Sequence, residues 1–317
     1  MIVGNAMAVA GGGGQRLSTS MPFALCAYGN SQSLPVSDLR DYSSQIVVVS
    51  FPEVTSVGSS VFSARYSRLT SVDLPACTYV GEGAFYDCQS LVSVNLPACE
   101  TVGDNAFQYC GTLPAIDLPA CTSVGYRAFC SCYALASANL PSCSYVGDFA
   151  FDGCRSLATV VLPSCQSVGD DAFCSCYALS SVDLPLCESL GSYAFYSCSA
   201  LGSVSLPACE TVGDFAFDGC PSLSELSLPM CSYIGACAFD SCMTLIGLTS
   251  TEMCQIEDNT FVGLGSFSVI VASGLLSQYV ADPLWQPYYS NLYDTNGEWG
   301  GDYYEPTPGP TPSYSTY

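Results

Sequence analysis

The chain has 317 residues, of which 49% are hydrophobic, and it carries 28 acidic side chains against six Arg, with no Lys and no His, for a net charge of −22. So negative a chain is a poor partner for nucleic acid or an anionic membrane, because both require a basic surface. The lack of His and Lys removes imidazole bases, most zinc sites, Schiff-base chemistry and the phosphate-binding Lys of nucleotide loops. We therefore expect no cofactor, no metal site and no enzyme.

Residues 1–45 precede the regular part of the sequence. The first ten are small and apolar, and Gly11–Gly14 then break any helix. Because no basic residue precedes Arg16, an N-terminal arm is favoured over a processed signal peptide, and both interpretations stay open. Residues 21–45 are assigned to an N-terminal cap, since the first coil of a solenoid would otherwise expose its apolar end. No run of apolar residues is long enough for membrane insertion.

A unit of 22 residues repeats through the centre of the chain. One copy, residues 91–110, reads LVSVNLPACETVGDNAFQYC. A fixed period between 20 and 50 residues is the signature of a solenoid. The Leu of the Leu-Pro step recurs at Leu74, Leu96, Leu118, Leu140, Leu162, Leu184, Leu206 and Leu228.

Each unit predicts one short strand. Leu91, Val94 and Leu96 place apolar side chains on one side, and the following Pro ends the strand. Gly103 is interpreted as the permissive backbone of the next turn, and Asp104 as the N-cap of one helical turn. The frame runs through residues 46–272 and predicts an α/β repeat fold: a solenoid of about eleven coils, with one parallel strand per coil and short helical or irregular convex segments.

Cysteine and phenylalanine occupy fixed positions of the unit. Cysteine behaves as a small hydrophobe with a weak S–H donor, so buried free thiols are favoured over disulfides. The phenylalanines are interpreted as a spine that stacks from coil to coil. The cysteines that follow the Pro are Cys77, Cys99, Cys121, Cys143, Cys165, Cys187, Cys209 and Cys231. The phenylalanines are Phe85, Phe107, Phe129, Phe151, Phe173, Phe195, Phe217 and Phe239.

The repeat stops near residue 272. Residues 273–292 have helical spacing around Tyr279 and Trp285, and they predict a C-terminal cap of two short helices laid over the last coil. Residues 293–317 are acidic and rich in Pro, Gly and Tyr. Such a composition cannot bury a core, so this tail is predicted to be extended or disordered.

The unit LPxCxxVGxxAFxxCxxLxxV resembles the repeats of BspA-like leucine-rich repeat proteins over about residues 46–272. The residues around Ser277-Gln278-Tyr279 and Asp282-Pro283-Leu284-Trp285 are also similar to the closing segment of that class. The resemblance implies an extracellular or surface-displayed binding module, often for host proteins, other cells or matrix. It implies no shared catalytic residues.

Two surfaces are candidates for binding. Strand residues that point away from the core form the candidate concave face, which is small, polar and mildly acidic. Its residues are Ser71, Asp73, Ser93, Asn95, Asp117, Ser137, Asn139, Ser181, Asp183, Ser203 and Ser205. The alternative interpretation of this face is a solvated sheet surface. The outer face carries tyrosines that suit glycans or proteins, although tyrosines packed between coils with only the hydroxyl wet are favoured.

We predict a non-enzymatic binding or adhesion module, extracellular or surface-displayed, that recognises a protein or glycan on another cell or on matrix. The alternative is a structural component that self-associates through its terminal segments into a fibre or a phage virion part. A carboxylate-based enzyme is the third hypothesis, and it lacks an acidic pair set in a cleft.

Overall fold

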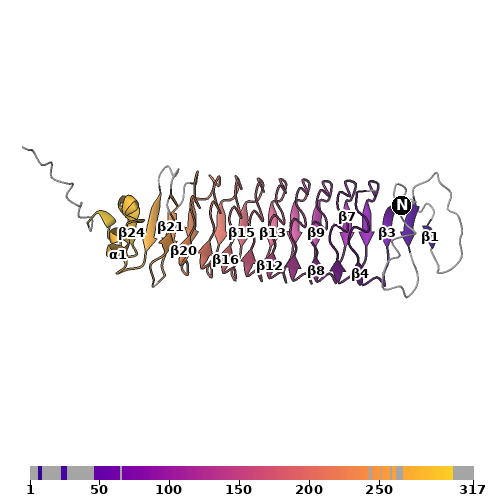
Figure 1. Cartoon of the computed structure of the whole chain (residues 1–317), viewed down its shortest axis with the longest axis horizontal. Coiled ribbons are helices and arrows are strands. Elements are labelled where there is room, and N and C mark those ends of the chain that lie inside the picture. The colour runs from indigo at the N-terminus through magenta and orange to yellow at the C-terminus, as the bar shows by residue number, and fades with distance from the viewer. Residues whose placement is uncertain are drawn as a thin grey trace, which may run out of the picture.

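The structure, a computed structural model, describes residues 6–8, 23–26, 46–64, 66–242, 245–250, 252–257, 259–261 and 267–302. Its coils stack along a nearly straight axis, with the N-terminal coils at one end of the rod and helix α1 (Leu276–Ala281) at the other (Figure 1). The predicted parallel solenoid is confirmed. Because the axis is nearly straight, the predicted concave face is a long, almost flat strip.

One strand of each coil comes from the Leu-x-x-Val-x-Leu segment, as predicted. The inward side chains of this strand, such as Val72 and Leu74, are fully buried, while its outward ones reach solvent. Strands of successive coils run parallel and most of them pair at a register of about one repeat, for example Ser137 with Thr159, although the row is divided into separate short sheets. The row comprises β3 (Ile46–Ser50), β5 (Ser71–Asp73), β7 (Ser93–Asn95), β9 (Ala115–Asp117), β11 (Ser137–Asn139), β13 (Thr159–Val161), β15 (Ser181–Asp183), β17 (Ser203–Ser205), β19 (Glu225–Ser227), β21 (Leu245–Leu248) and β23 (Ser268–Val271).

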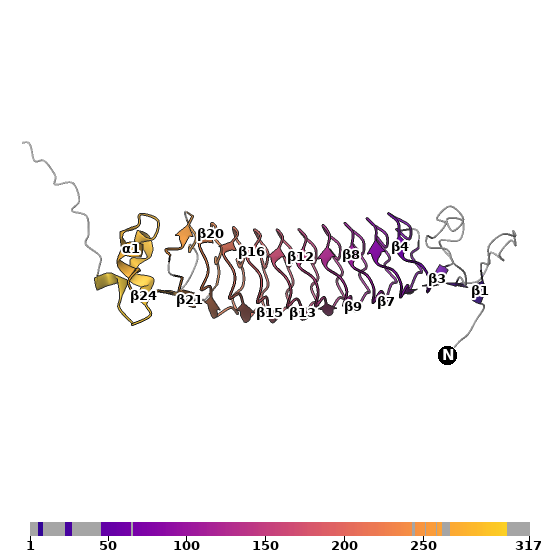
Figure 2. The same cartoon turned by 90° about the horizontal axis from the view of Figure 1, so that it is seen from below.

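In the described part of the chain, ten of the eleven coils also contain a second strand, which the sequence did not predict. It has only two residues, and it follows a turn in which the N–H of Cys99 donates to the carbonyl of Leu96 (3.1 Å), with Pro97 at the second position. These strands form a ten-stranded parallel sheet, here called the second sheet (Figure 2). Its members are β4 (Ser56–Val57), β6 (Tyr79–Val80), β8 (Thr101–Val102), β10 (Ser123–Val124), β12 (Tyr145–Val146), β14 (Ser167–Val168), β16 (Ser189–Leu190), β18 (Thr211–Val212), β20 (Tyr233–Ile234) and β22 (Gln255–Ile256).

The glycine after the second strand is required by packing, which corrects its interpretation as a flexible turn residue. A Cβ built on Gly147 would lie 2.8 Å from the carbonyl carbon of Gly125 in the preceding coil. A Cβ built on Gly103, at the same position of another coil, would lie 2.8 Å from the carbonyl oxygen of Val80. Neither glycine has a positive φ. The side chain is therefore excluded by the close approach of neighbouring coils, and not by the backbone conformation.

The segment after this glycine consists of turns, so the predicted helical turn and its Asp N-cap are wrong. Two residues per coil adopt positive φ there, for example Asn105 at 56° and Tyr109 at 63°, which breaks any helix. The Asp side chain instead reaches forward to the next coil. Oδ1 of Asp104 accepts the N–H of Tyr126 (2.9 Å), and Oδ1 of Asp148 accepts the N–H of Asp170 (3.0 Å).

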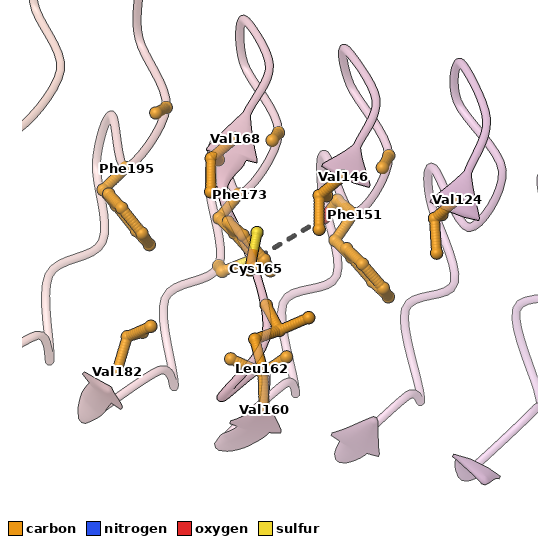
Figure 3. Packing of buried hydrophobic residues seen from close by; sticks show 14 of the residues in the cluster. Val124, Val146, Phe151, Val160, Leu162, Cys165, Val168, Phe173, Val182 and Phe195 are labelled. Atoms are coloured by element: carbon orange, nitrogen blue, oxygen red, sulfur yellow. Dashed lines mark hydrogen bonds between the residues drawn. The ribbon is translucent and has the colours of Figure 1, made fainter. Parts of the chain in front are cut away.

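The interior is built from the predicted files of side chains. Phe85 and its equivalents up to Phe239 are fully buried and stacked, with ring centroids 5.0–5.6 Å apart within this run. Figure 3 shows three of these rings, Phe151, Phe173 and Phe195, lying in step in neighbouring coils. The cysteines that follow the Pro are free and buried, and each donates to the carbonyl two residues on, as Cys77 does to Tyr79 (3.3 Å). The phenylalanines thus stack from coil to coil and these thiols are free and buried, as expected from the sequence.

The C-terminal end is covered by α1 and the 3-10 helix η3 (Gln286–Asn291). Trp285, between these helices, is buried and donates from Nε1 to the carbonyl of Cys254 (2.9 Å). Tyr279 accepts the N–H of Cys254 through its hydroxyl (2.8 Å). This segment therefore supplies hydrogen-bond partners to the backbone of the coil that contains β21 and β22, and its apolar side chains extend the core of the solenoid.

The two terminal segments are described in part. In the segment assigned to the arm and N-terminal cap, β1 (Ala6–Ala8) pairs with β2 (Phe23–Cys26), and β2 pairs with β3, all in parallel. In the segment assigned to the tail, β24 (Leu292–Asp294) pairs with β23, and η4 (Gly300–Asp302) follows. The remainder of residues 1–45 and residues 303–317 lie outside the described residues. The assignment of 1–45 to an arm and cap stays a prediction.

Candidate binding faces

The eleven residues assigned to the candidate concave face all lie on outward positions of the first row of strands. We call this surface the strand face. Ser93, Asn95, Asp117, Ser181, Asp183, Ser203 and Ser205 are exposed, and Ser71, Asp73, Ser137 and Asn139 are half-buried. Stacking brings residues 22 apart into lateral neighbours, so the face is a row of mainly small polar side chains, interrupted by apolar ones at Ala115 and the exposed Val161.

Asparagine side chains hydrogen-bond two of the carboxylates of the strand face. Nδ2 of Asn95 donates to Oδ1 of Asp73 (2.7 Å), and Nδ2 of Asn139 donates to Oδ1 of Asp117 (2.8 Å). Each bond joins neighbouring coils, as cross-strand pairs do on any sheet. The carboxylates are thereby spaced apart by amides. Among the residues that the structure describes, no three His, Cys, Asp or Glu side chains are placed to hold a metal ion.

The tyrosines of the outer face divide into two groups. Tyr86, Tyr193, Tyr196 and Tyr233 are half-buried, as the packed interpretation expects. That interpretation is wrong for a second group, which is exposed: Tyr79, Tyr126, Tyr133, Tyr145 and Tyr177. Arg127 stacks over the rings of Tyr126 and Phe149, with its guanidinium carbon 4.9 Å from each centroid. The guanidinium of Arg127 therefore makes cation–π contacts within the protein.

A trough lies on the outer side of the second sheet between Tyr79 and Tyr145. Its volume is about 400 Å³. Thr101 and Ser123 lie between the two tyrosines along the sheet. Gly103 and Gly125 also line the trough and contribute no side chain. The trough exists because two coils with small residues separate two coils with tyrosine at the same position of the unit.

The trough is acidic. Glu82 and Asp104 line it together with Ser59, and no lining residue in the described part of the chain is cationic. Partial burial, reinforced by the negative charges of Asp148 and Asp104, raises the pKa of the Tyr145 hydroxyl. The hydroxyl of Tyr145 therefore stays protonated and available as a donor over a wide range of pH.

Sequence reasoning placed tyrosines on the outer face but did not find the trough. The signal was present in the residue that precedes each Val-Gly step, which is Tyr, Thr, Ser and Tyr in four successive coils. Its meaning depended on knowing that this residue lies on a second strand and points outward. Without that strand, the position read as part of an irregular convex segment.

Comparison with protein families gives a match to the model of the BspA type leucine-rich repeat region, in overlapping segments at residues 55–180, 122–246 and 166–276. No curated protein matches. Similar solved structures include a leucine-rich cell surface protein from Faecalibacterium prausnitzii, with 20% identity over 81% of this chain and 91% of that one and a TM-score of 0.38.

Two further solved structures are similar. A leucine-rich repeat protein of T. pallidum has 24% identity over 69% of this chain and 81% of that chain, with a TM-score of 0.33. The pneumococcal vaccine antigen PcpA has 15% identity over 87% of this chain and 78% of that chain, with a TM-score of 0.44. In the part of the chain that the structure describes, none of the helices has the length and hydropathy needed to cross a membrane.

Proposed function

We propose a function from one established premise: the chain belongs to the family of proteins with BspA-type leucine-rich repeats. The proposed function is that of a non-enzymatic binding or adhesion module, displayed on a surface or outside the cell, that recognises a protein or a glycan. Repeat solenoids of this kind present long surfaces on a rigid frame, and their function is recognition by those surfaces.

The observation that supports this proposal is that different positions of each coil form the interior and the exposed surface. The Leu, Phe and Cys positions of the unit form a continuous buried interior. The outward positions of the first strands do not contribute to this interior. They vary from coil to coil among Ser, Asp, Asn, Ala, Thr, Val and Glu. Variation on a rigid, evenly spaced row is what a recognition surface requires, and we propose the strand face as the surface that meets a partner.

The proposal is tested by binding of the purified full chain, fluorescently labelled, to intact cells and to matrix preparations. Ser181→Arg and Ser203→Arg place a bulky cation on the strand face, at exposed neighbouring positions of β15 and β17. We expect each to reduce binding at least tenfold, as substitutions at the centre of an interface do. Gln166→Arg, at an exposed position outside the strand face, adds the same charge and serves as the control.

Light scattering coupled to size-exclusion chromatography separates this function from self-association into a fibre or virion part. We expect a monomer at micromolar concentration, because copies with a net charge of −22 repel one another. A defined oligomer or filament, together with no binding to any cell or matrix tested, would favour the structural alternative.

A further inference from the structure

The trough between Tyr79 and Tyr145 differs from the neighbouring stretch of the second sheet, at β14 and β16, in how its hydroxyls are satisfied. In the next stretch of the same row, the hydroxyl of Ser189 donates to that of Ser167 (3.0 Å), so these groups are partnered within the sheet. Thr101 and Ser123 hold the equivalent positions in the trough. Their hydroxyls make no hydrogen bond to any described part of the chain, so both are available to a ligand.

The two tyrosines at the ends of the trough are likewise available to a ligand. Tyr79 and Tyr145 are 45% and 44% exposed, and neither ring stacks on another aromatic side chain of the described residues. Tyr233, the next tyrosine of this row, instead bonds through its hydroxyl to Glu257 (3.1 Å). A tyrosine offers an apolar ring face together with a polar hydroxyl, which suits ligands that have both kinds of surface.

We propose that this trough is a binding site for a neutral oligosaccharide. The ring faces of Tyr79 and Tyr145 would meet the C–H faces of sugar rings, and the hydroxyls of Thr101 and Ser123 would bond sugar hydroxyls. The carboxylates of Glu82 and Asp104 accept hydrogen bonds from sugar O–H groups, and bonds to an ionised acceptor are the stronger kind. This site rests on the proposed binding function and adds to it a ligand class and a location.

The charge of the trough decides which sugars fit. Its carboxylates have no cationic side chain beside them within the described lining. An acidic sugar, such as a sialylated or sulfated one, would bring like charges together at short range, which is repulsive. A neutral sugar meets only acceptors and donors, so neutral glycans are favoured over anionic ones.

The size of the trough decides how many sugars fit. Three strand steps separate β6 from β12, which places the two tyrosines about 14 Å apart at ~4.8 Å per step. The volume of about 400 Å³ lies within the range of small-ligand sites. A single sugar ring cannot touch both tyrosines. The site is therefore built for a short chain of rings that lies along the solenoid axis.

The test uses the full chain on an array of neutral, sialylated and sulfated oligosaccharides, followed by calorimetric titration with the neutral tetrasaccharide that gives the strongest signal. We expect neutral glycans to bind and acidic ones to give no signal. Tyr79→Ala and Tyr145→Ala should each weaken the tetrasaccharide at least tenfold. Ser123→Arg should abolish binding, because the new side chain fills the trough.

Tyr177→Ala is the matched control, because this tyrosine is 43% exposed and lies outside the trough. Circular dichroism establishes that every variant is folded. Absence of any neutral glycan on the array, a preference for acidic glycans, or equal affinity of the Tyr79 and Tyr177 variants would overturn the site. Binding of an Arg-rich peptide in the trough, with no glycan bound, would also overturn the site.

One outcome separates this site from the proposed function. Cell binding that persists in Ser123→Arg and is lost in Ser181→Arg, without glycan binding, would retain the proposed function and reject the glycan site.

Discussion

The thiol of Cys110 donates to the carbonyl oxygen of Phe85, which lies 25 positions earlier in the chain, with Sγ 3.2 Å from that oxygen. The bond joins one coil to the coil before it, deep in the interior where both groups are buried. The same bond recurs down the solenoid, as between Cys154 and Phe129 (3.1 Å). The cysteines that lie three residues after a phenylalanine of the spine, such as Cys110 and Cys154, therefore tie successive coils together, whereas the cysteines that follow the Pro bond within their own coil.

The buried thiols should be chemically inert in the folded protein. Burial raises the pKa of Cys110 and of Cys143 to about 12, so almost no thiolate exists at pH 8. Among the cysteines whose side chains the structure describes, Cys174 and Cys237 are half-buried and should react with a thiol reagent before the buried ones, because their thiols are more accessible. Mass spectrometry of the native protein after timed alkylation measures this order, and full reaction in urea is the control. Alkylation of most thiols at the unfolded rate would contradict the buried interior.

The phenylalanine spine should be a large source of stability. Phe173 is fully buried between Phe151 and Phe195, at 5.3 Å from each ring centroid. Phe173→Ala removes both stacking contacts and leaves a cavity, at a cost of about 3–5 kcal/mol. Urea unfolding followed by circular dichroism measures the loss. Tyr177→Ala, in the same coil but exposed, should change the unfolding midpoint little, and an equal loss in both variants would disprove the role of the spine.

Glycine after the second strand should tolerate no side chain once a preceding coil is present. Gly147→Ala would force Gly125 and its coil apart, and we expect a clear fall in melting temperature. Gly58 holds the same position after β4, the edge strand of the second sheet, where, of the residues that the structure describes, an added Cβ would meet only Val61, at 3.7 Å. Gly58→Ala should therefore be harmless. A matched pair of thermal melts decides the point, and equal effects would show that close approach is not the reason for the glycine.

Stability should increase as pH falls from 7.5 to 5. Burial, with the charges of Asp152 and Asp170, raises the pKa of Asp171 to about 6. Since the folded chain binds this proton more tightly than the unfolded chain, the contribution of Asp171 is fully present below its unfolded pKa and is lost as pH rises through about 6. Asp171→Asn should raise the melting temperature at pH 7.5 and flatten its pH dependence, because Asn also accepts the φ of 54° found here.

The control for this effect is Asp183→Asn, which removes the same charge from an exposed position of the strand face. Melting curves across the pH range should show a smaller rise for that variant. If both variants gain equally, the effect comes from the net charge of the chain and not from the packed position of Asp171.

Much of the fold was readable because the unit repeats. A strand of three residues is too short to be recognised once, but the same Leu-x-x-Val-x-Leu segment in successive coils shows which side faces inward. The phenylalanine spine was readable for the same reason, since residues 22 apart must lie in line. The second strands were not, because two residues around Val80 or Val102 show no alternation, and their pairing exists only between coils.

The interpretation of Gly103 and Asp104 failed for a related reason. Both were read within their own unit, as a turn and a helix cap, because local rules describe contacts between residues close in sequence. In the structure both act across the gap between coils: Gly103 lets the coil before it approach, and Asp104 bonds Tyr126 in the coil after it. The same limit applied to the trough, whose ends lie 66 residues apart, from Tyr79 to Tyr145.

The order of residues alone determined the period of the coil, the direction in which its strands pair and the identity of the side chains inside it, since a hydrophobic pattern that recurs every 22 residues can be buried in only one way. Tertiary packing decided how far apart the coils lie, which polar groups they share and where the outer surface is hollow. Those properties depend on distances between coils, and no single unit contains them.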